Sequence, residues 1–296
     1  MDTSKDQPTL LGLIIDSNPF KLNRLGIPTK ELFSHILVFV NSFLALRPEN
    51  RLTIIGASSE LCQYFIPEEF NTLDNNKTWI DIEHSQIRKV DIDFLSGLQT
   101  LFEKSSIDNI QNKDTCKITN ALSRALCYIN KNLKSTSKND MHSRIMIISA
   151  SDDDPKQYIP IMNCIFAAQK LDIIIDVCRI SEQRSPFLEQ AAEITGGRYA
   201  EEIIPSQLLQ KLLFTFLPDQ YTRQFIQAPI KKEIDFRAVC FCHKKVVDIG
   251  YVCSTCLSIF CHYVPICSTC QSKFVVTAQK GNETDAYPPK LPEKVM

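Results

Sequence analysis

Seven of the twelve cysteines lie between residues 240 and 270, and their spacing is typical of a metal site. Two Cys-x-x-Cys pairs, Cys253 with Cys256 and Cys267 with Cys270, are separated by ten residues. Each pair can place two thiolates on one side of a tight turn, and four sulfurs converging in a tetrahedron are a donor set that Zn²⁺ prefers. Disulfides or a redox Cys-x-x-Cys would use the same residues. The polar start of the sequence lacks a signal peptide, so we expect an intracellular zinc site.

A second set of ligands is interleaved with the first. Cys240, Cys242 and Cys261 could bind a second zinc ion with either His243 or His262 as the fourth ligand. This order resembles the cross-brace of RING-type modules. The alternative is that the three cysteines are small buried groups, and that the histidines face solvent or form hydrogen bonds around the first site. One zinc ion is therefore expected, and a second is an open alternative.

A segment of about thirty residues buries little apolar surface, so bound metal must hold it together. The other five cysteines are scattered through apolar surroundings. We expect them to be free thiols that pack like small hydrophobic residues and have no catalytic role. They are Cys62, Cys116, Cys127, Cys164 and Cys178.

Length and composition limit what the zinc segment can be attached to. The 296 residues suffice for one domain of about 200 residues and a small module. Hydrophobic residues make up 44% of the chain, so it can bury a core, and the net charge of -1 argues against a general binder of polyanions. The longest apolar runs are shorter than the roughly 20 residues that cross a bilayer. We expect a soluble protein without a membrane partner.

Strands alternate with helices before residue 218. Continuous apolar runs predict buried strands, and a 3.6-residue apolar period predicts helices. The segment 67–89, which contains the only tryptophan, Trp79, is predicted to be an irregular excursion, and Gly196 with Gly197 a helix stop. The predicted strands are 10–16, 51–58, 143–149, 171–180 and 198–202, with 59–66 an antiparallel edge strand. The predicted helices are 29–46, 91–104, 118–133, 159–171, 187–194 and 205–216.

This alternation predicts an α/β fold, a Rossmann-like doubly wound and mostly parallel sheet with helices on both faces. Ligands of such sheets bind beyond the carboxyl ends of the strands, where Asp16, Thr119 and the loop 149–154 should meet. No Gly-rich dinucleotide or phosphate loop and no Gly-x-Ser-x-Gly elbow is present. The carboxylates could bind Mg²⁺ with Thr119, but acidic residues at strand ends more often form turns and cap helices. We do not expect an enzyme.

The order of elements and the crevice aspartate resemble a von Willebrand factor A domain. That family binds a metal ion through Asp-x-Ser-x-Ser after the first strand, a threonine, and an aspartate after the fourth strand. This sequence keeps Asp16 but has Asn18 and Phe20 in place of the serines and Ala150 in place of the last aspartate. Because Phe20 and Ala150 offer no side-chain oxygen, no Mg²⁺ is expected at the Asp16 crevice.

An A domain with a degenerate metal site, followed by this cysteine pattern, resembles the small A-domain subunits of the general transcription and DNA-repair factor TFIIH. The resemblance rests on YIPIMNCIFAAQKLDIIIDVC, EITGGRY, FLPDQ and the segments from DFRAVCFCH to PICSTC. It implies a nuclear, non-catalytic core subunit that scaffolds by binding the larger A-domain zinc subunit and, through it, the helicase-containing complex. The implied roles are RNA polymerase II transcription initiation and nucleotide excision repair.

The expected domain layout is a disordered N-terminus (1–9), a von Willebrand factor A-like domain (10–218), a linker (219–237), a C4-type or RING-like zinc module (238–274) and a flexible tail (275–296). Two alternative functions remain. A RING-like module could give ubiquitin-ligase activity. Basic residues in and around the module could bind nucleic acid, although nearby Glu233, Asp235 and Asp248 favour a solvated face and at most weak or indirect DNA contact. The basic residues are Lys231, Lys232, Arg237, Lys244, Lys245 and Lys273.

Overall fold

The computed structural model describes residues 7–26, 28–59, 61–66, 79–105, 115–135, 141–154, 157–181, 183–201, 205–226, 240–243 and 247–273. The chain divides into two compact units, residues 1–236 and 237–296, and each is described by itself.

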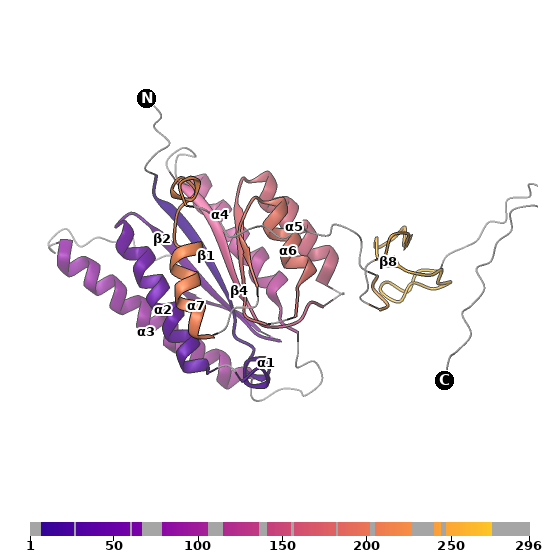
Figure 1. Ribbon diagram of the computed structural model, residues 1–296, viewed down its shortest axis with the longest axis horizontal. Helices are drawn as coiled ribbons and strands as arrows, with labels where there is room; N and C mark the ends of the chain where they lie inside the picture. Colours follow the sequence, from indigo (N-terminus) through magenta and orange to yellow (C-terminus); the bar gives the residue numbers. More distant parts are fainter. Residues whose placement is uncertain are drawn as a thin grey trace, which may run out of the picture. The chain divides into compact units, whose positions relative to one another are not determined.

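The first unit is built on a six-stranded sheet with the strand order β3-β2-β1-β4-β5-β6 (Figure 1). Edge strand β3 runs antiparallel to β2, as predicted, and every other pairing is parallel. The strands are β1 (Thr9–Asp16), β2 (Arg51–Ala57), β3 (Cys62–Ile66), β4 (His142–Ser149), β5 (Ile174–Arg179) and β6 (Tyr199–Ala200). Every residue of β1 is buried, as expected for a central parallel strand that is covered on both faces.

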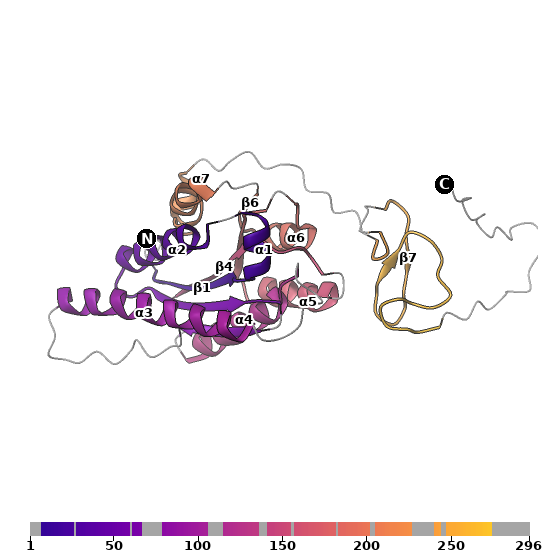
Figure 2. The same ribbon diagram turned by 90° about the horizontal axis from the view of Figure 1, so that it is seen from below.

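Helices cover both faces of this sheet and complete a von Willebrand factor A-like fold, as predicted. The helices α2 (Thr29–Leu46), α3 (Trp79–Ser105) and α7 (Pro205–Lys211) pack on one face. The opposite face carries α4 (Ile118–Ser135), α5 (Tyr158–Lys170) and α6 (Pro186–Ile194). Figure 2 shows α2 and α7 on one side of β1 and β4, with α4 and α5 on the other. The short helix α1 is Pro19–Arg24, a π-helical turn spans Leu212–Phe216, and a 3₁₀ turn spans Thr222–Gln224.

The helix α2 is long and apolar enough to cross a membrane, judged by length and composition alone. Its apolar side chains recur at helical spacing, and six of them are buried in the core of this domain: Leu32, Phe33, Ile36, Phe39, Val40 and Phe43. Packing against the sheet therefore accounts for its hydrophobicity.

Two glycines allow Phe65 to fill the space between β2 and α3. A Cβ atom on Gly56 would lie 2.0 Å from the Phe65 ring, and one on Gly97 would lie 2.4 Å from it. The ring also packs edge-on against Phe94, with centroids 5.8 Å apart. A larger residue at either glycine would push α3 away from the sheet.

Two expectations about the first unit are wrong. The helix predicted at 91–104 begins earlier, at Trp79, so part of the predicted irregular segment 67–89 is helical, and residues 67–78 lie outside the described residues. No glycine or proline interrupts the chain from Trp79 to Ser96, so the helix extends from its packed part around Val90 and Phe94.

Cys127 is exposed because it faces away from the buried side of α4. Cys116 and Cys178 are buried, as predicted.

A buried ion pair connects the segment after Pro218 to the sheet of the first unit. Arg223 donates to both carboxylate oxygens of Asp176, at 2.8 and 2.6 Å. Arg144 donates to the carbonyl oxygens of Phe216 and Pro218, and burial lowers the pKa of its guanidinium to about 10. Arg223, which lies in the segment expected to be linker, thus contacts the core of the A domain.

Candidate metal centres

The second unit contains four cysteine sulfurs gathered at one point. The sulfurs of Cys253, Cys256, Cys267 and Cys270 all lie within 4.8 Å of one another. The Sγ–Sγ distances are 3.7 Å from Cys253 to Cys270 and 3.6 Å from Cys256 to Cys267. Four sulfurs at about 2.3 Å from a tetrahedral zinc ion would be about 3.8 Å apart, whereas a disulfide needs about 2.05 Å. The predicted four cysteines therefore fit a zinc ion and do not form disulfides.

The two Cys-x-x-Cys pairs have the same local backbone. In the first, the Cys253 N–H donates to the Ser258 carbonyl at 2.9 Å; in the second, the Cys267 N–H donates to the Ser272 carbonyl at 2.9 Å. Each turn passes through a residue with positive φ, 61° at Leu257 and 60° at Gln271. These turns aim both sulfurs of a pair in one direction. The Cys256 N–H donates to the Cys253 sulfur and is the main cause that lowers the pKa of that thiol to about 6, which favours the metal-binding thiolate.

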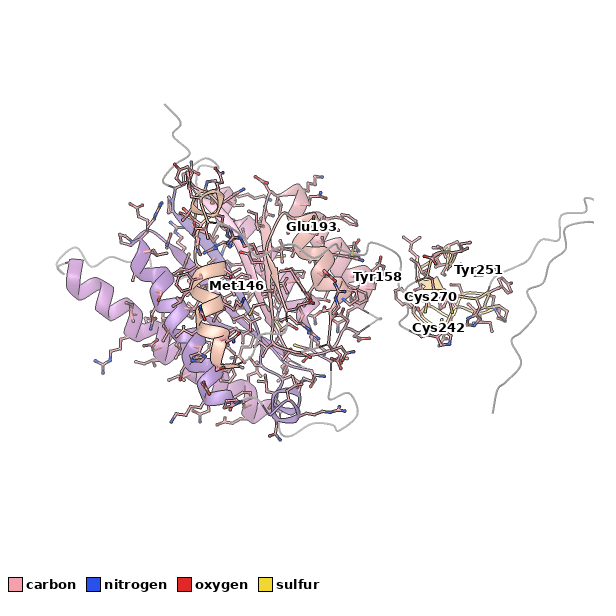
Figure 3. All side chains as sticks on the ribbon, in the orientation of Figure 1. Met146, Tyr158, Glu193, Cys242, Tyr251 and Cys270 are labelled. Carbon is pink, nitrogen blue, oxygen red and sulfur yellow. The ribbon has the colours of Figure 1, made fainter. Side chains whose placement is uncertain are left out.

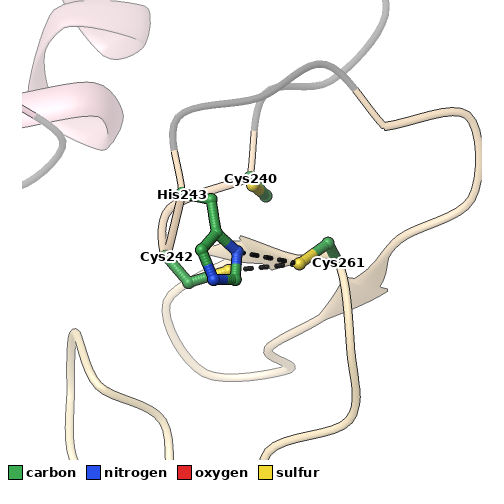
Figure 4. A group of neighbouring side chains, drawn as sticks. All are labelled: Cys240, Cys242, His243 and Cys261. Carbon is green, nitrogen blue, oxygen red and sulfur yellow. Dashed lines mark hydrogen bonds between the residues drawn. The ribbon is translucent and has the colours of Figure 1, made fainter. Parts of the chain in front are cut away.

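The second group consists of Cys240, Cys242, His243 and Cys261, whose ligand atoms also lie within 4.8 Å of one another. Figure 4 shows these side chains converging from two segments of the chain. The Cys261 sulfur is 3.4 Å from the Cys242 sulfur and 3.2 Å from Nδ1 of His243. Of the two histidines considered from the sequence, His243 joins the three cysteines in this group, and Nδ1 of His262 lies 3.4 Å from the Cys261 sulfur. Three thiolates and an imidazole also suit Zn²⁺.

The two groups alternate along the chain. Residues 240–243 belong to the second group, 253–256 to the first, Cys261 to the second and 267–270 to the first. Figure 3 labels one ligand of each group, Cys242 and Cys270. Along the chain, β7 (Tyr251–Val252) directly precedes Cys253 and β8 (Ile259–Phe260) directly precedes Cys261. The two strands form an antiparallel sheet. The buried hydrophobic cluster of the described part of this unit holds one large residue, Phe260, with Cys253 and Cys267.

The crevice of the first unit is arranged differently. The Asp16 carboxylate accepts hydrogen bonds from the backbone N–H groups of Asn18 at 3.1 Å, Ala150 at 2.9 Å and Ser151 at 2.6 Å. Asp16 is 3% exposed, so these donors replace water. The predicted meeting of Asp16 with the 149–154 loop is therefore confirmed. The Thr119 hydroxyl instead donates to the Gln157 side chain at 2.8 Å.

Cations of the protein itself neutralise the next carboxylate in the crevice. Lys21, on α1, lies 2.9 Å from Asp152, and the fully buried Arg179 lies 3.8 Å from the same carboxylate. Asp153 accepts hydrogen bonds from the Ser185 hydroxyl and the Phe187 N–H at the start of α6, and burial raises its pKa. The side chains of Asp16, Asp152 and Asp153, which could have bound Mg²⁺, therefore form internal hydrogen bonds and ion pairs.

Comparison with known proteins agrees with these features. Residues 8–271 match the model of the family described as transcription factor Tfb4. The chain belongs to the Tfb4 family. The chain is 43% identical to the general transcription and DNA repair factor IIH subunit tfb4 of Schizosaccharomyces pombe, over 93% of this chain and 92% of that protein. It is 37% identical to subunit TFB4 of Arabidopsis thaliana, over 91% and 90% of the two chains.

A solved structure also matches a large part of this chain. The crystal structure of the TFIIH p34 N-terminal domain is 31% identical to this chain, with a TM-score of 0.60, and it is covered completely by 72% of this chain. The Tfb4 family match reaches residue 271 and so includes all eight residues of the two candidate metal groups.

Sequence reasoning missed two serines of the second unit. Ser258 Oγ lies 3.1 Å from the Cys256 sulfur, and Ser272 Oγ lies in hydrogen-bonding contact with the Cys270 sulfur. The signal was an internal repeat, CSTCLS at 253–258 and CSTCQS at 267–272. Of the basic residues considered for nucleic-acid binding, only Lys273, which is exposed, lies among the described residues.

Proposed function

We propose that this chain is a non-catalytic structural subunit of the general transcription and DNA repair factor IIH core complex, acting in the nucleus in RNA polymerase II transcription initiation and nucleotide excision repair. The observation that carries the proposal is the 43% identity to the S. pombe subunit over nearly the whole length of both chains. Relatives that align over nearly their whole length at this level share their fold and architecture, and this relative is a subunit of that factor.

Two Zn²⁺ ions hold the second unit together in this proposal. Cys253, Cys256, Cys267 and Cys270 bind the first, and Cys240, Cys242, Cys261 and His243 bind the second. The convergence of these ligand atoms and the shortage of buried apolar residues support both sites. Zinc in such closed sites is structural, because all four positions are taken by protein ligands and none is left for a substrate.

The A domain acts as a binding surface in this proposal, without Mg²⁺ at the Asp16 crevice. The three N–H donors to Asp16 and the Lys21 and Arg179 cations near Asp152 support this assignment, because they occupy the oxygens that a metal ion would need. The scaffolding partner is the larger A-domain zinc subunit of the same complex. Contact with the helicase-containing part is made through that partner, and any DNA contact is weak or indirect.

Co-expression of the full chain with the larger A-domain subunit tests this function. We expect the two chains to co-elute in gel filtration. The complex should also form in buffer without Mg²⁺, prepared without EDTA so that bound zinc is kept. A Cys127→Ser chain should form the same complex as the native chain, since Cys127 is exposed and lies outside both metal groups. Separate elution of the two chains, with full zinc content in each, would contradict the scaffolding role.

One observation favours a second function. The two candidate metal groups alternate along the chain in the cross-brace order of RING-type modules, which can recruit a ubiquitin-conjugating enzyme. An autoubiquitination assay with the zinc-loaded chain decides between the two. Zinc-dependent modification would support a ligase, and its absence across a panel of conjugating enzymes leaves the structural role.

A further inference from the structure

The serine that ends each CSTC-x-S repeat serves its cysteine pair in two ways. Its carbonyl accepts the N–H of the first cysteine, which closes the turn. Its hydroxyl lies against the sulfur of the second cysteine, Ser258 against Cys256 and Ser272 against Cys270. Ser272 Oγ also lies 3.9 Å from the Cys253 sulfur. Two independent copies of one sequence motif thus place a hydroxyl at equivalent positions of one four-sulfur group.

The chemistry of that group calls for such donors. Four thiolates around one Zn²⁺ carry a net charge of -2, whereas three thiolates and a neutral imidazole carry -1. Excess negative charge on sulfur is stabilised by hydrogen bonds, and an O–H donor to an ionised acceptor is among the stronger ones. Ser258 is fully buried, so its hydroxyl lacks water as an alternative partner and must use a protein acceptor.

We propose that Ser258 and Ser272 are positioning residues of the four-sulfur site, whose hydroxyls donate to the metal-bound thiolates of Cys256 and Cys270 and so raise its metal affinity and protect its sulfurs from electrophiles. The inference rests on the proposed zinc site. It goes beyond that proposal by assigning two hydrogen-bond donors to the thiolates of this site.

The same repeats supply a matched control. Ser254 and Ser268 occupy the second position of each CSTC and are exposed. Replacing them removes a hydroxyl from the same turns without touching the Ser258 or Ser272 position. Ser272 is only half-buried and therefore accepts threonine more easily than the fully buried Ser258 does. Ser272→Thr thus keeps a hydroxyl at this position in a variant that can fold.

The test uses the full chain loaded with Zn²⁺ and, in parallel, with Co²⁺. Ser258→Ala and Ser272→Ala should each lower zinc affinity about tenfold in competition with a chelator. Each should move the sulfur-to-cobalt charge-transfer band to lower energy, because the sulfur lone pairs lose a donor, and should speed alkylation by iodoacetamide. Ser272→Thr should restore the native band. The proposal is overturned if Ser272→Ala matches Ser268→Ala in band position and affinity. A native chain without any charge-transfer band would instead refute the zinc site itself.

Discussion

The crevice of the A domain and the second unit both gather metal-ligand residue types, yet they use them in opposite ways. In the crevice, the Asp16 carboxylate accepts hydrogen bonds from three backbone N–H groups, and a large apolar core on both faces of the sheet holds the fold. In the second unit the ligand atoms converge within each of two groups, and the buried apolar cluster is small. A domain with a sufficient core can turn its metal ligands into structural acceptors. For a module with so few buried apolar residues, we expect the fold to depend on a bound metal ion.

Removing one ligand of the four-sulfur group should have the largest effect. Cys267→Ser should abolish the fold of the second unit while leaving the A domain intact, because structural zinc contributes on the order of 10 to 16 kcal/mol in peptide models. Zinc per chain, measured by mass spectrometry of the native protein, should fall by at least one ion. The unfolding midpoint of the A domain should stay unchanged in calorimetry.

Cys127→Ser is the control for that experiment, because it removes an exposed sulfur of the A domain. Its zinc content should equal that of the native chain. Full zinc content in Cys267→Ser would contradict the assigned site, and a lowered A-domain midpoint would contradict the independence of the two units.

Asp16 offers the reverse test in the A domain. Asp16→Ala leaves three buried N–H groups without an acceptor, so we expect a loss of about 3 to 5 kcal/mol in the free energy of unfolding. Urea denaturation of the full chain, followed by far-UV circular dichroism, measures it. Asp16→Asn keeps one carbonyl oxygen and should lose less. Adding Mg²⁺ should change neither the native chain nor either variant, and stabilisation of the native chain by Mg²⁺ would refute the structural role of this carboxylate.

The ion pair that closes the A domain should have a somewhat smaller effect. Arg223→Met removes the bidentate partner of the fully buried Asp176, at an expected cost of about 3 kcal/mol, since Arg144 stays near that carboxylate. A chain ending after Pro218 should lose as much, whereas one ending after Ile226 should not. Combining Arg223→Met with Asp176→Asn should cost less than the sum of the single changes. Equal stability of the two truncated chains would place the end of the domain at Pro218.

The sequence predicted the fold well because its signals are local. The buried run of β1, the helical apolar period of α2 and the stop at Gly196, whose φ is 71°, are each readable over a few residues. The start of α3 at Trp79 is not readable from the local sequence. The helix extends back through a stretch without helix breakers because of packing further along the same helix. The contact of Arg223 with Asp176 is likewise not readable from the sequence, because the two residues lie 47 positions apart in the chain.

The four cysteines of the first group were found from spacing alone, because two residues between cysteines fit one tight turn. Spacing could not separate His243 from His262, since both adjoin a cysteine of the second group and only the folded backbone brings one ring to the other three ligand atoms. The serine hydroxyls were missed because their role depends on the turn geometry.

The smallest predicted effect concerns the strain that remains in these turns. Leu257 has φ of 61° and is 60% exposed, so its side chain contributes little packing, while its Cβ makes the left-handed conformation unfavourable by about 1 kcal/mol. Leu257→Gly should relieve this and, after the entropy that glycine costs, raise zinc affinity about two- to fivefold in chelator competition. Leu257→Ala removes nearly the same side chain but keeps the Cβ, so it should bring no gain. Gln271, with φ of 60° at the equivalent position, provides an internal replicate. A gain from alanine equal to that from glycine would show that the exposed side chain, rather than backbone strain, limits the stability of the turn.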